Sequence, residues 1–315
     1  MKKVLKLVFY ISLLLLVLSP LFVQDSGVSQ EEYVSKFEIE GGNFLEIDGY
    51  KTYYIDINPE FEKTVLLIHG FGGSATNWLP IIPSISENHR IVAVDLKGFG
   101  FSEKKRDEDF SHPSQVKFLN SFVEELNLEN FTIVGHSMGG NIATMYLQEY
   151  PEKVEKLVLV SAALLTKEEV DTLRGNTLKI LNWPILREYV RVFLKFGFNE
   201  SRVKMVFNSG MYEEVEVDEP FFVNPTIFEG WEYVAIKMTS VVHENTLSKP
   251  LEDIQVPVFI IWGQKDTWVP LSKGKFLNEK IEESELNILE NVNHLPMFED
   301  PEGFSIQLKK SLQSS

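Results

Sequence analysis

The sequence predicts an α/β domain built on a doubly wound, mostly parallel sheet. Short apolar runs, the form expected of strands buried on both faces of a parallel sheet, recur along the chain. Between several of them lie segments whose apolar residues recur at helical spacing. This alternation indicates an open sheet with helices on both faces, whose ligand site lies at the carboxyl ends of the strands.

The predicted strands begin with a hairpin. Residues 43–57 form it, with Asp48-Gly49 as the turn. The later predicted strands are mainly apolar segments at Thr64–Ile68, Arg90–Val94, Phe131–Val134, Lys156–Val160, Val258–Trp262 and Glu285–Leu289.

Two intervening segments have a clear helical pattern. Gln115–Leu126 places its apolar residues on one stripe. Asn141–Glu149 has a similar apolar spacing, and Pro151 ends it because proline cannot continue a helix.

The alternation of strands and helices breaks between about Leu164 and Lys249. This stretch is aromatic-rich, mostly helical in pattern and far longer than an ordinary connection between two strands. We therefore predict a core formed by residues 40–163 and 250–315, with residues 164–249 inserted as a helical lid over the site. Most of the lid aromatics are expected to pack within the lid itself.

Residues 1–27 differ from the rest of the chain. Lys2, Lys3 and Lys6 precede the nearly unbroken apolar run Leu7–Val23. Such a pattern is typical of an export signal, and the run is at the short end of what spans a bilayer. We expect a signal peptide or a membrane anchor, with the protein exported or held at the outer face of the cytoplasmic membrane. A buried helix, the alternative, would normally show a polar face.

Charge and composition exclude several functions. The formal net charge is −16, whereas a nucleic-acid site needs a clustered basic face. The one dense basic run, Lys104–Arg106, is followed at once by acidic residues and is interpreted as a solvated loop. The chain has no cysteine, which excludes disulfides, thiolate chemistry and cysteine-held metals.

Ser137 is the predicted nucleophile. The segment Gly135–Gly139 has the form G-x-S-x-G, and it joins a predicted strand to a predicted helix, as this motif requires. The turn is tight enough to need glycines on either side of the serine. It exposes the hydroxyl at the edge of the sheet beside a helix N-terminus, which favours developing negative charge. A helix-capping serine is the alternative.

His294 is the predicted general base, because a serine hydroxyl needs a neighbour that removes its proton. It follows the last predicted strand, in a loop that would return it to the carboxyl edge of the sheet. His69 and His136 lie beside glycines at strand ends and are interpreted as structural. The remaining histidines lie in connecting segments or in the lid: His89, His112 and His243.

Asp266 is predicted to orient this histidine. It follows the strand that ends at Trp262, and the other position for such an acid, directly after Val160, has no carboxylate. Asp95 is the alternative, but it precedes the serine in the sequence. We interpret Asp95 as holding the loop Lys97–Gly100 that follows it.

Acyl transfer also needs N–H groups directed at the oxyanion. Met138, directly after the nucleophile, supplies one, and Phe71 in the glycine-rich loop after the first apolar run supplies another. A phosphate-binding function for this loop lacks the Lys-Ser or Lys-Thr pair that it needs. Three side chains are candidates for substrate contact: Trp78, His136 and Trp268.

These features together resemble the α/β-hydrolase superfamily, and within it the lid-bearing esterases, lipases and carbon–carbon-bond hydrolases. The resemblance covers about residues 44–308, with the lid matching only in position and length. It implies an eight-stranded mostly parallel sheet, no cofactor and no metal, and hydrolysis through an acyl-enzyme. It rests on the order Ser137, Asp266, His294 and on the segments His69–Ser74, Asp95–Ser102 and Gly135–Gly140.

We therefore expect a carboxylic-ester hydrolase that acts on small apolar esters with short- to medium-chain acyl groups. Hydrolysis of the carbon–carbon bond of ring-cleavage products, lipase activity and acyl transfer stay open, as does a non-catalytic binding protein. Carbon–carbon hydrolases often have asparagine where this chain has His136, which favours esters. Selectivity for an anionic acyl group would point to an arginine of the lid: Arg174, Arg187 or Arg191.

Overall fold

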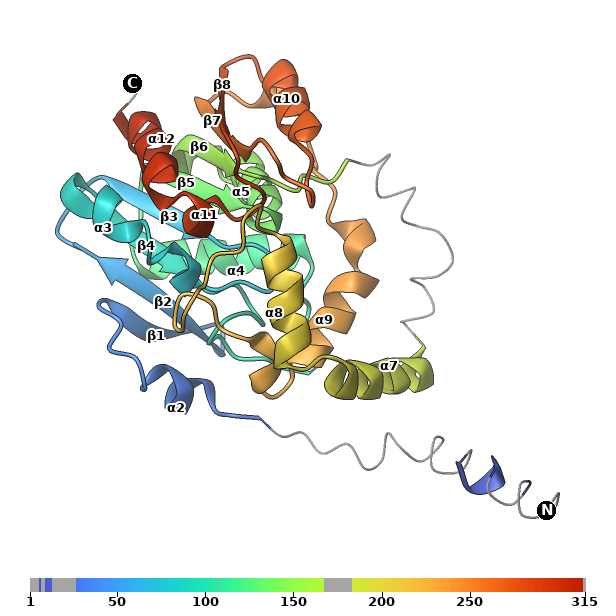
Figure 1. The fold of residues 1–315 in the computed structure, drawn as a ribbon. Coiled ribbons are helices and arrows are strands. Elements are labelled where there is room, and N and C mark those ends of the chain that lie inside the picture. Colours follow the sequence, from blue (N-terminus) through green and yellow to red (C-terminus); the bar gives the residue numbers. More distant parts are fainter. Residues whose placement is uncertain (1–5, 7–8, 13–26, 107, 167–182, 314–315) are drawn as a thin grey trace.

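The computed structural model describes residues 6, 9–12, 27–106, 108–166 and 183–313. An eight-stranded sheet with the order β1-β2-β4-β3-β5-β6-β7-β8 forms its centre (Figure 1). β2 pairs antiparallel with both β1 and β4, and every other neighbouring pair is parallel. The strands are β1 (Gly42–Ile47), β2 (Tyr50–Ile57), β3 (Thr64–Ile68), β4 (Arg90–Val94), β5 (Phe131–His136), β6 (Val154–Val160), β7 (Val258–Gly263) and β8 (Ser284–Leu289).

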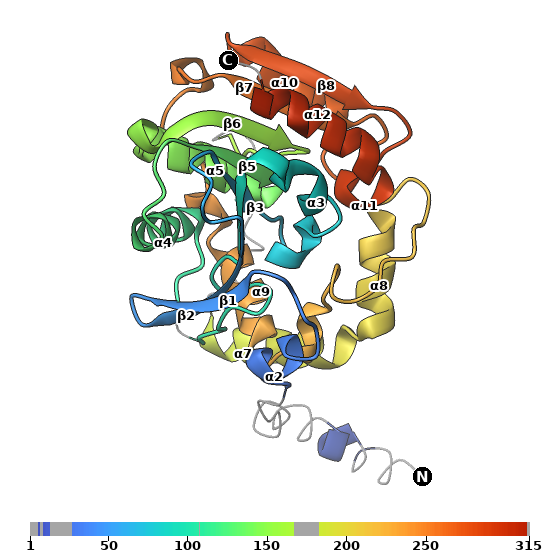
Figure 2. The ribbon, with the colours of Figure 1, turned by 90° about the vertical axis from the view of Figure 1, so that its left-hand side faces the viewer.

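Helices cover both faces of this sheet, which confirms the predicted fold class (Figure 2). Side chains alternate along each strand, so that Leu66 and Ile68 belong to one buried cluster and Val65 and Leu67 to the other. The first cluster is covered by α4 (His112–Glu125), α5 (Met138–Glu149) and α10 (Leu271–Lys280). The second is covered by α3 (Ile82–Ile85) and α12 (Pro301–Gln313).

Local signals explain where these elements begin. The predicted hairpin is present, and both residues of its turn, Asp48 and Gly49, have positive φ. α4 begins earlier than its apolar stripe because the Ser111 side chain accepts a hydrogen bond from the Ser114 N–H, and Pro113 fits the first turn. α5 begins at Met138, directly after the predicted nucleophile.

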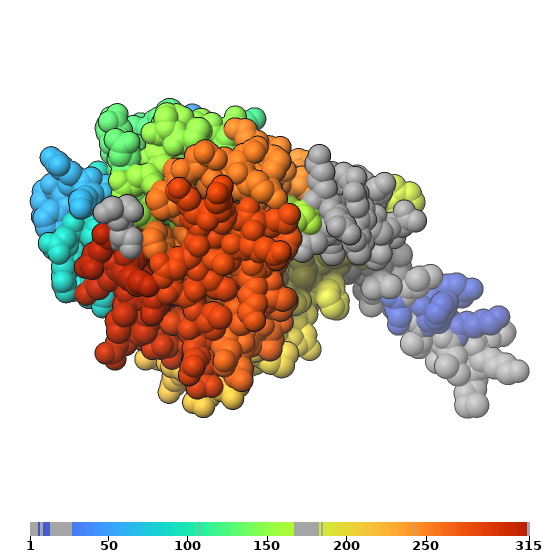
Figure 3. All heavy atoms as spheres, turned by 90° about the horizontal axis from the view of Figure 1, so that it is seen from above, coloured from blue at the N-terminus to red at the C-terminus, as the bar shows by residue number. Residues whose placement is uncertain are grey.

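Between β6 and β7 the described chain is mainly helical. It contains α7 (Pro184–Gly197), α8 (Glu200–Ser209) and α9 (Trp231–Ser240). α7 and α9 pack together near α2 (Gln30–Val34), at the end of the molecule opposite α12 (Figures 1 and 2). Seen from that opposite end, residues after β7 form much of the surface (Figure 3).

The predicted N-terminal segment lies mostly outside the described residues. Within the described part of the chain, no helix combines the length and the apolar character needed to cross a membrane. The chain joins the domain at Val28, which forms a β-bridge with Phe228 just before α9. In α2, Tyr33 packs edge-to-face on the same phenylalanine, with ring centroids 5.5 Å apart.

Candidate active site

Ser137 occupies a strained turn between β5 and α5. Its φ is 51° and its ψ −118°, a conformation that costs a non-glycine residue energy and is typical of functional sites. The main chain is held on both sides, because the Ser137 N–H donates to Val160 O over 2.9 Å and its carbonyl accepts from the Ala163 N–H over 2.9 Å. The side chain is left to line a cavity.

Close backbone contacts account for the glycines that flank this serine. A Cβ atom on Gly135 would lie 2.4 Å from the carbonyl oxygen of Gly139, and one on Gly139 would lie 2.4 Å from that of Ile68. No side chain fits at either position. The strand, the turn and the helix can therefore pack as the predicted motif requires only with glycine at these two positions.

His294 and Asp266, far apart in sequence, form a buried pair. The distance from His294 Nδ1 to Asp266 Oδ2 is 2.9 Å. The other carboxylate oxygen accepts from the N–H groups of Trp268, over 3.0 Å, and Val269, over 2.8 Å. Because an ionised carboxylate only accepts hydrogen bonds, Nδ1 carries a proton and Nε2 of the neutral ring is left as the acceptor.

Asp95, the alternative acid, lies in a different network. Its two carboxylate oxygens accept from the N–H groups of Ala75 and Phe101, each over 2.6 Å. Nearby, the Lys104 ammonium donates to Gly100 O over 2.7 Å. Burial raises the pKa of Asp95 and lowers that of Lys104. Asp95 thus holds Phe101, directly after the loop Lys97–Gly100, and also ties this segment to Ala75 after β3, a link that the sequence did not indicate.

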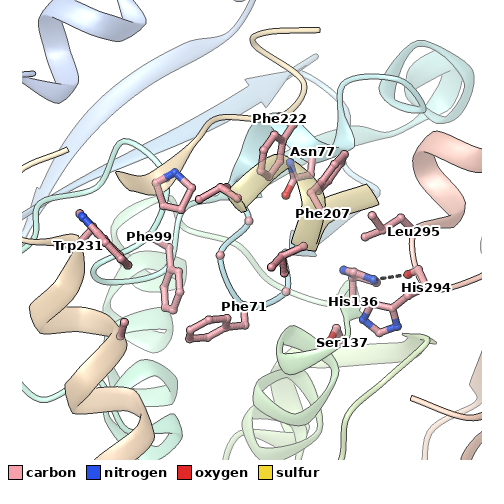
Figure 4. Close-up of a pocket in the computed structure, with 18 of the residues that line it drawn as sticks. Phe71, Asn77, Phe99, His136, Ser137, Phe207, Phe222, Trp231, His294 and Leu295 are labelled. Atoms are coloured by element: carbon pink, nitrogen blue, oxygen red, sulfur yellow. Dashed lines mark hydrogen bonds between the residues drawn. The ribbon is translucent and has the colours of Figure 1, made fainter. Parts of the chain in front are cut away.

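A cavity of about 340 Å³ lies between the sheet and helices α8 and α9. Ser137 and the His294 ring lie side by side at one end of it (Figure 4). None of the described residues that line the cavity is a lysine, arginine, aspartate or glutamate. Much of the wall is aromatic, with Phe71 and Phe99 from loops of the core and Phe198, Phe207, Phe222 and Trp231 from the inserted segment.

Both N–H groups predicted for the oxyanion lie at this end of the cavity. A Cβ atom on Gly70 would lie 3.1 Å from Ser137 Cβ, so the loop carrying Phe71 approaches the serine closely. Within the described chain, the Phe71 N–H has no main-chain acceptor. Met138 is the first residue of α5, where an N–H has no acceptor in its own helix. Each can therefore donate to a bound oxygen.

The three candidates for substrate contact have different positions. Trp268 lines the cavity, and its ring centroid lies 5.1 Å from that of His294. His136 also lines it, but is largely buried, and its Nε2 donates to the main-chain oxygen of His294 over 2.8 Å. Burial, with the nearby His294, lowers the pKa of His136 to about 3.

The structure corrects the prediction for Trp78. This side chain is fully buried and does not line the cavity. It closes a short 3₁₀ turn, Ala75–Trp78, and its ring stacks on Phe304 of α12 at a centroid distance of 6.4 Å. Trp78 therefore packs the core and is not placed to contact substrate.

Two residues of the site were missed by the sequence analysis. Asn77 lines the cavity, and its Nδ2 donates to Phe221 O of the inserted segment over 2.7 Å. Glu299 accepts hydrogen bonds from the N–H groups of Asn293 and Leu295, the two neighbours of His294. An acidic residue in the first turn after a predicted catalytic loop is a signal that could have identified Glu299. Asn77 has no comparable signal.

Among the residues that the structure describes, no group of three or more histidine, aspartate or glutamate side chains is arranged to hold an ion.

The sheet order and the serine turn define the class of α/β hydrolases. A family model for the alpha/beta hydrolase fold matches residues 63–301, and the chain belongs to this family. The protein is thus a hydrolase of the α/β fold. It is 30% identical to monoacylglycerol lipase ABHD6 of Rattus norvegicus over 257 residues, which cover 77% of this chain and 73% of the lipase.

Two solved structures are similar in fold. An esterase from Exiguobacterium antarcticum superposes with a TM-score of 0.70 at 24% identity, covering 87% of this chain and all of the esterase (100%). A serine hydrolase involved in carbazole degradation (CarC) gives a TM-score of 0.67 at 22% identity, covering 86% of this chain and 98% of that protein. At these identities the likeness establishes the fold alone.

Proposed function

We propose that this protein is a carboxylic-ester hydrolase that acts on small apolar esters with short- to medium-chain acyl groups. One observation carries the proposal: Ser137, on its strained turn, lies beside His294 at the end of an apolar cavity, and Asp266 holds the far side of the imidazole. The 30% identity to a protein named as a monoacylglycerol lipase supports ester chemistry.

The mechanism follows from the positions of these groups. His294 Nε2 takes the proton as Ser137 Oγ attacks the ester carbonyl, and Asp266 stabilises the imidazolium that forms. The N–H groups of Phe71 and Met138 donate to the oxyanion. His294 then protonates the departing alcohol, which leaves an acyl group on Ser137. Water, activated by the same histidine, releases the acid and restores the serine.

The cavity limits the substrate. Its volume of about 340 Å³ is near the lower end of ordinary ligand sites, roughly 300–1,000 Å³. Each buried methylene contributes roughly 0.8 kcal/mol, so longer acyl chains bind better until the space is full. A charged acyl group would lose its hydration without gaining an ion pair, because no lysine or arginine belongs to the described lining.

The inserted segment, residues 164–249, acts in this proposal as a lid. Phe198, Phe207 and Trp231 of this segment line the cavity opposite the core loops. The hydrogen bond from Asn77 to Phe221 O joins the two sides. An acyl chain longer than the cavity would require these sides to separate.

A panel of p-nitrophenyl esters with acyl chains of increasing length tests the proposal, with Ser137→Ala as the control for background hydrolysis. We expect kcat/KM to rise with chain length to an optimum at short or medium chains and then fall. A preference for emulsified long-chain triglycerides would replace esterase with lipase. Turnover of a dienoic diketone acid in preference to every ester would replace it with carbon–carbon hydrolysis. Acyl transfer would appear as a new ester when a second alcohol is supplied.

A further inference from the structure

Helix α7 carries three large apolar residues on its exposed side. Ile185, Phe193 and Phe196 are 76%, 67% and 74% exposed, and their spacing of eight and three residues places them on one side of the helix. Trp183, just before the helix, is 73% exposed as well. We refer to these four residues as the α7 patch. Large apolar side chains gathered on one exposed face usually mark a contact surface.

The inner side of α7 carries charge. The Arg191 side chain is 6% exposed, and its Nε donates to Glu188 over 2.9 Å, while its Nη1 lies 3.9 Å from Glu232 of α9. A surface helix normally has the reverse arrangement, with charges outside and apolar residues inside. Arg191 thus faces α9, and the α7 patch lies on the exposed side of the helix.

The N-terminal apolar run joins the domain at the same end of the molecule as this patch. Leu7–Val23 ends five residues before Val28, which forms a β-bridge with Phe228. Phe228 lies three residues before α9, the helix on which α7 packs. Both views of the ribbon place α2, which follows Val28, at the same end of the molecule as α7 (Figures 1 and 2).

The cavity reaches the same end of the molecule. Phe198 directly follows α7, lines the cavity, and contacts Trp231 of α9 with ring centroids 6.2 Å apart. It is still 36% exposed. Phe198 is therefore a partly exposed apolar residue that adjoins both α7 and the cavity.

We propose that the α7 patch docks on a lipid bilayer and that the N-terminal apolar run holds the protein at that surface. The α7 patch and the N-terminal apolar run, which are far apart in the sequence, then enter the membrane together. Stable attachment usually requires two such contacts. A second copy of the chain would cover the patch but would leave the position of the apolar run unexplained. The inference does not depend on the ester hydrolysis proposed above.

The negative net charge of the protein favours a neutral lipid surface over an anionic one. With a formal net charge of −16, the chain gains nothing overall from an anionic membrane, so the contact must come from apolar burial. We therefore expect docking on vesicles of phosphatidylcholine, with little dependence on salt concentration.

The absence of cysteine allows a direct test, because one introduced cysteine is the only thiol that can be labelled. In the full chain, Phe196→Cys or Ile185→Cys carries an environment-sensitive fluorophore on the α7 patch, and Leu14→Cys carries it in the apolar run. Ile306→Cys on α12, where the native side chain is 57% exposed, is the matched control. Each protein is reconstituted into phosphatidylcholine vesicles with and without brominated acyl chains.

We expect brominated lipid to quench the labels at positions 196, 185 and 14 and to leave the label at position 306 unchanged. Labels at 196 and 185 that behave like the one at 306 would overturn the proposal, whether or not position 14 is quenched. Disulfide-linked dimers of unlabelled Phe196→Cys in the vesicles would also overturn it, because they would show that a second copy covers the patch.

Discussion

His136 Nε2 donates a 2.8 Å hydrogen bond to the main-chain oxygen of His294. The residue before the predicted nucleophile therefore holds the main chain of the predicted base. Burial lowers the pKa of His136 to about 3, so the ring stays neutral at pH values well above 3. The link gives the His294 loop a fixed distance from the serine turn.

Removing this link should lower kcat more than it changes KM. His136→Ala leaves the His294 loop free to move, and a small displacement of a catalytic group costs roughly tenfold or more in rate. His136→Gln, which keeps a donor, should recover part of the loss. His112→Gln is a control at a buried histidine outside the cavity lining. Unchanged kcat in His136→Ala would show that the hydrogen bond has no positioning role.

Asp266→Asn should reduce kcat by several orders of magnitude. The amide can donate to Nδ1, which favours the tautomer whose Nε2 already carries a proton and cannot accept one from serine. Asp95→Asn is the comparison, and it should lower the thermal midpoint while leaving kcat per folded molecule close to the unsubstituted value. If Asp95→Asn abolished turnover and Asp266→Asn did not, the acid would be misassigned.

Substitution of Trp268 should weaken substrate binding, whereas substitution of Trp78 should lower stability. Trp268→Ala removes a side chain that lines the cavity and should raise KM for apolar esters. Trp78→Ala leaves a hole beside Phe304 and should lower the free energy of unfolding by roughly 3–5 kcal/mol, with KM of the folded protein unchanged. Steady-state kinetics of both variants measure KM, and denaturant titration measures the free energy of unfolding. A raised KM in Trp78→Ala would show that Trp78 contacts substrate.

The parts of the fold that sequence reasoning predicted are those set by local pattern. The segment Thr64–Ile68 is apolar at every position after Thr64 because both faces of β3 are buried, whatever its neighbours are. The turn at Ser137 was predictable for the same reason. Its glycines are required by close contacts within the motif and with the adjoining strand β3. The start of α4 was missed because Ser111 and Pro113, not the apolar stripe, determine it.

The parts that were not predicted depend on contacts between distant segments. His136 and His294 are 158 positions apart, and no local pattern indicates that one supports the other. The orientation of Trp78 depends on the position of α12, and the pairing of Asn77 with Phe221 depends on how the inserted segment folds back. The burial of Arg191 on α7 likewise involves another helix, because its Nη1 lies 3.9 Å from Glu232 of α9.

Buried histidines should make stability depend on pH. Burial lowers the pKa of His112 to about 3, whereas an unfolded chain protonates histidine near 6.5. Below about pH 6.5 the unfolded chain thus binds a proton that the native protein does not, so the free energy of unfolding falls as the pH falls. For this one residue the loss reaches about 2 kcal/mol at pH 5.

Denaturant unfolding at pH 7.5 and pH 5 measures this effect. His112→Asn should unfold with a pH dependence that is smaller by that amount, because the variant lacks the proton-binding group in both states. His69 and His136, whose pKa values burial also lowers, remain in the variant and contribute to the slope that is left. An identical slope in the variant would show that His112 protonates in the native protein.

A fluorophosphonate, which phosphonylates activated serines, tests the assignment of Ser137 as the nucleophile. The intact protein is incubated with the probe, its mass is measured, and the labelled peptide is sequenced by mass spectrometry. We expect one adduct, on Ser137, that forms in parallel with the loss of esterase activity. It should be absent from Ser137→Ala and should form much more slowly in His294→Ala. An adduct on another serine, or full esterase activity in Ser137→Ala, would contradict it.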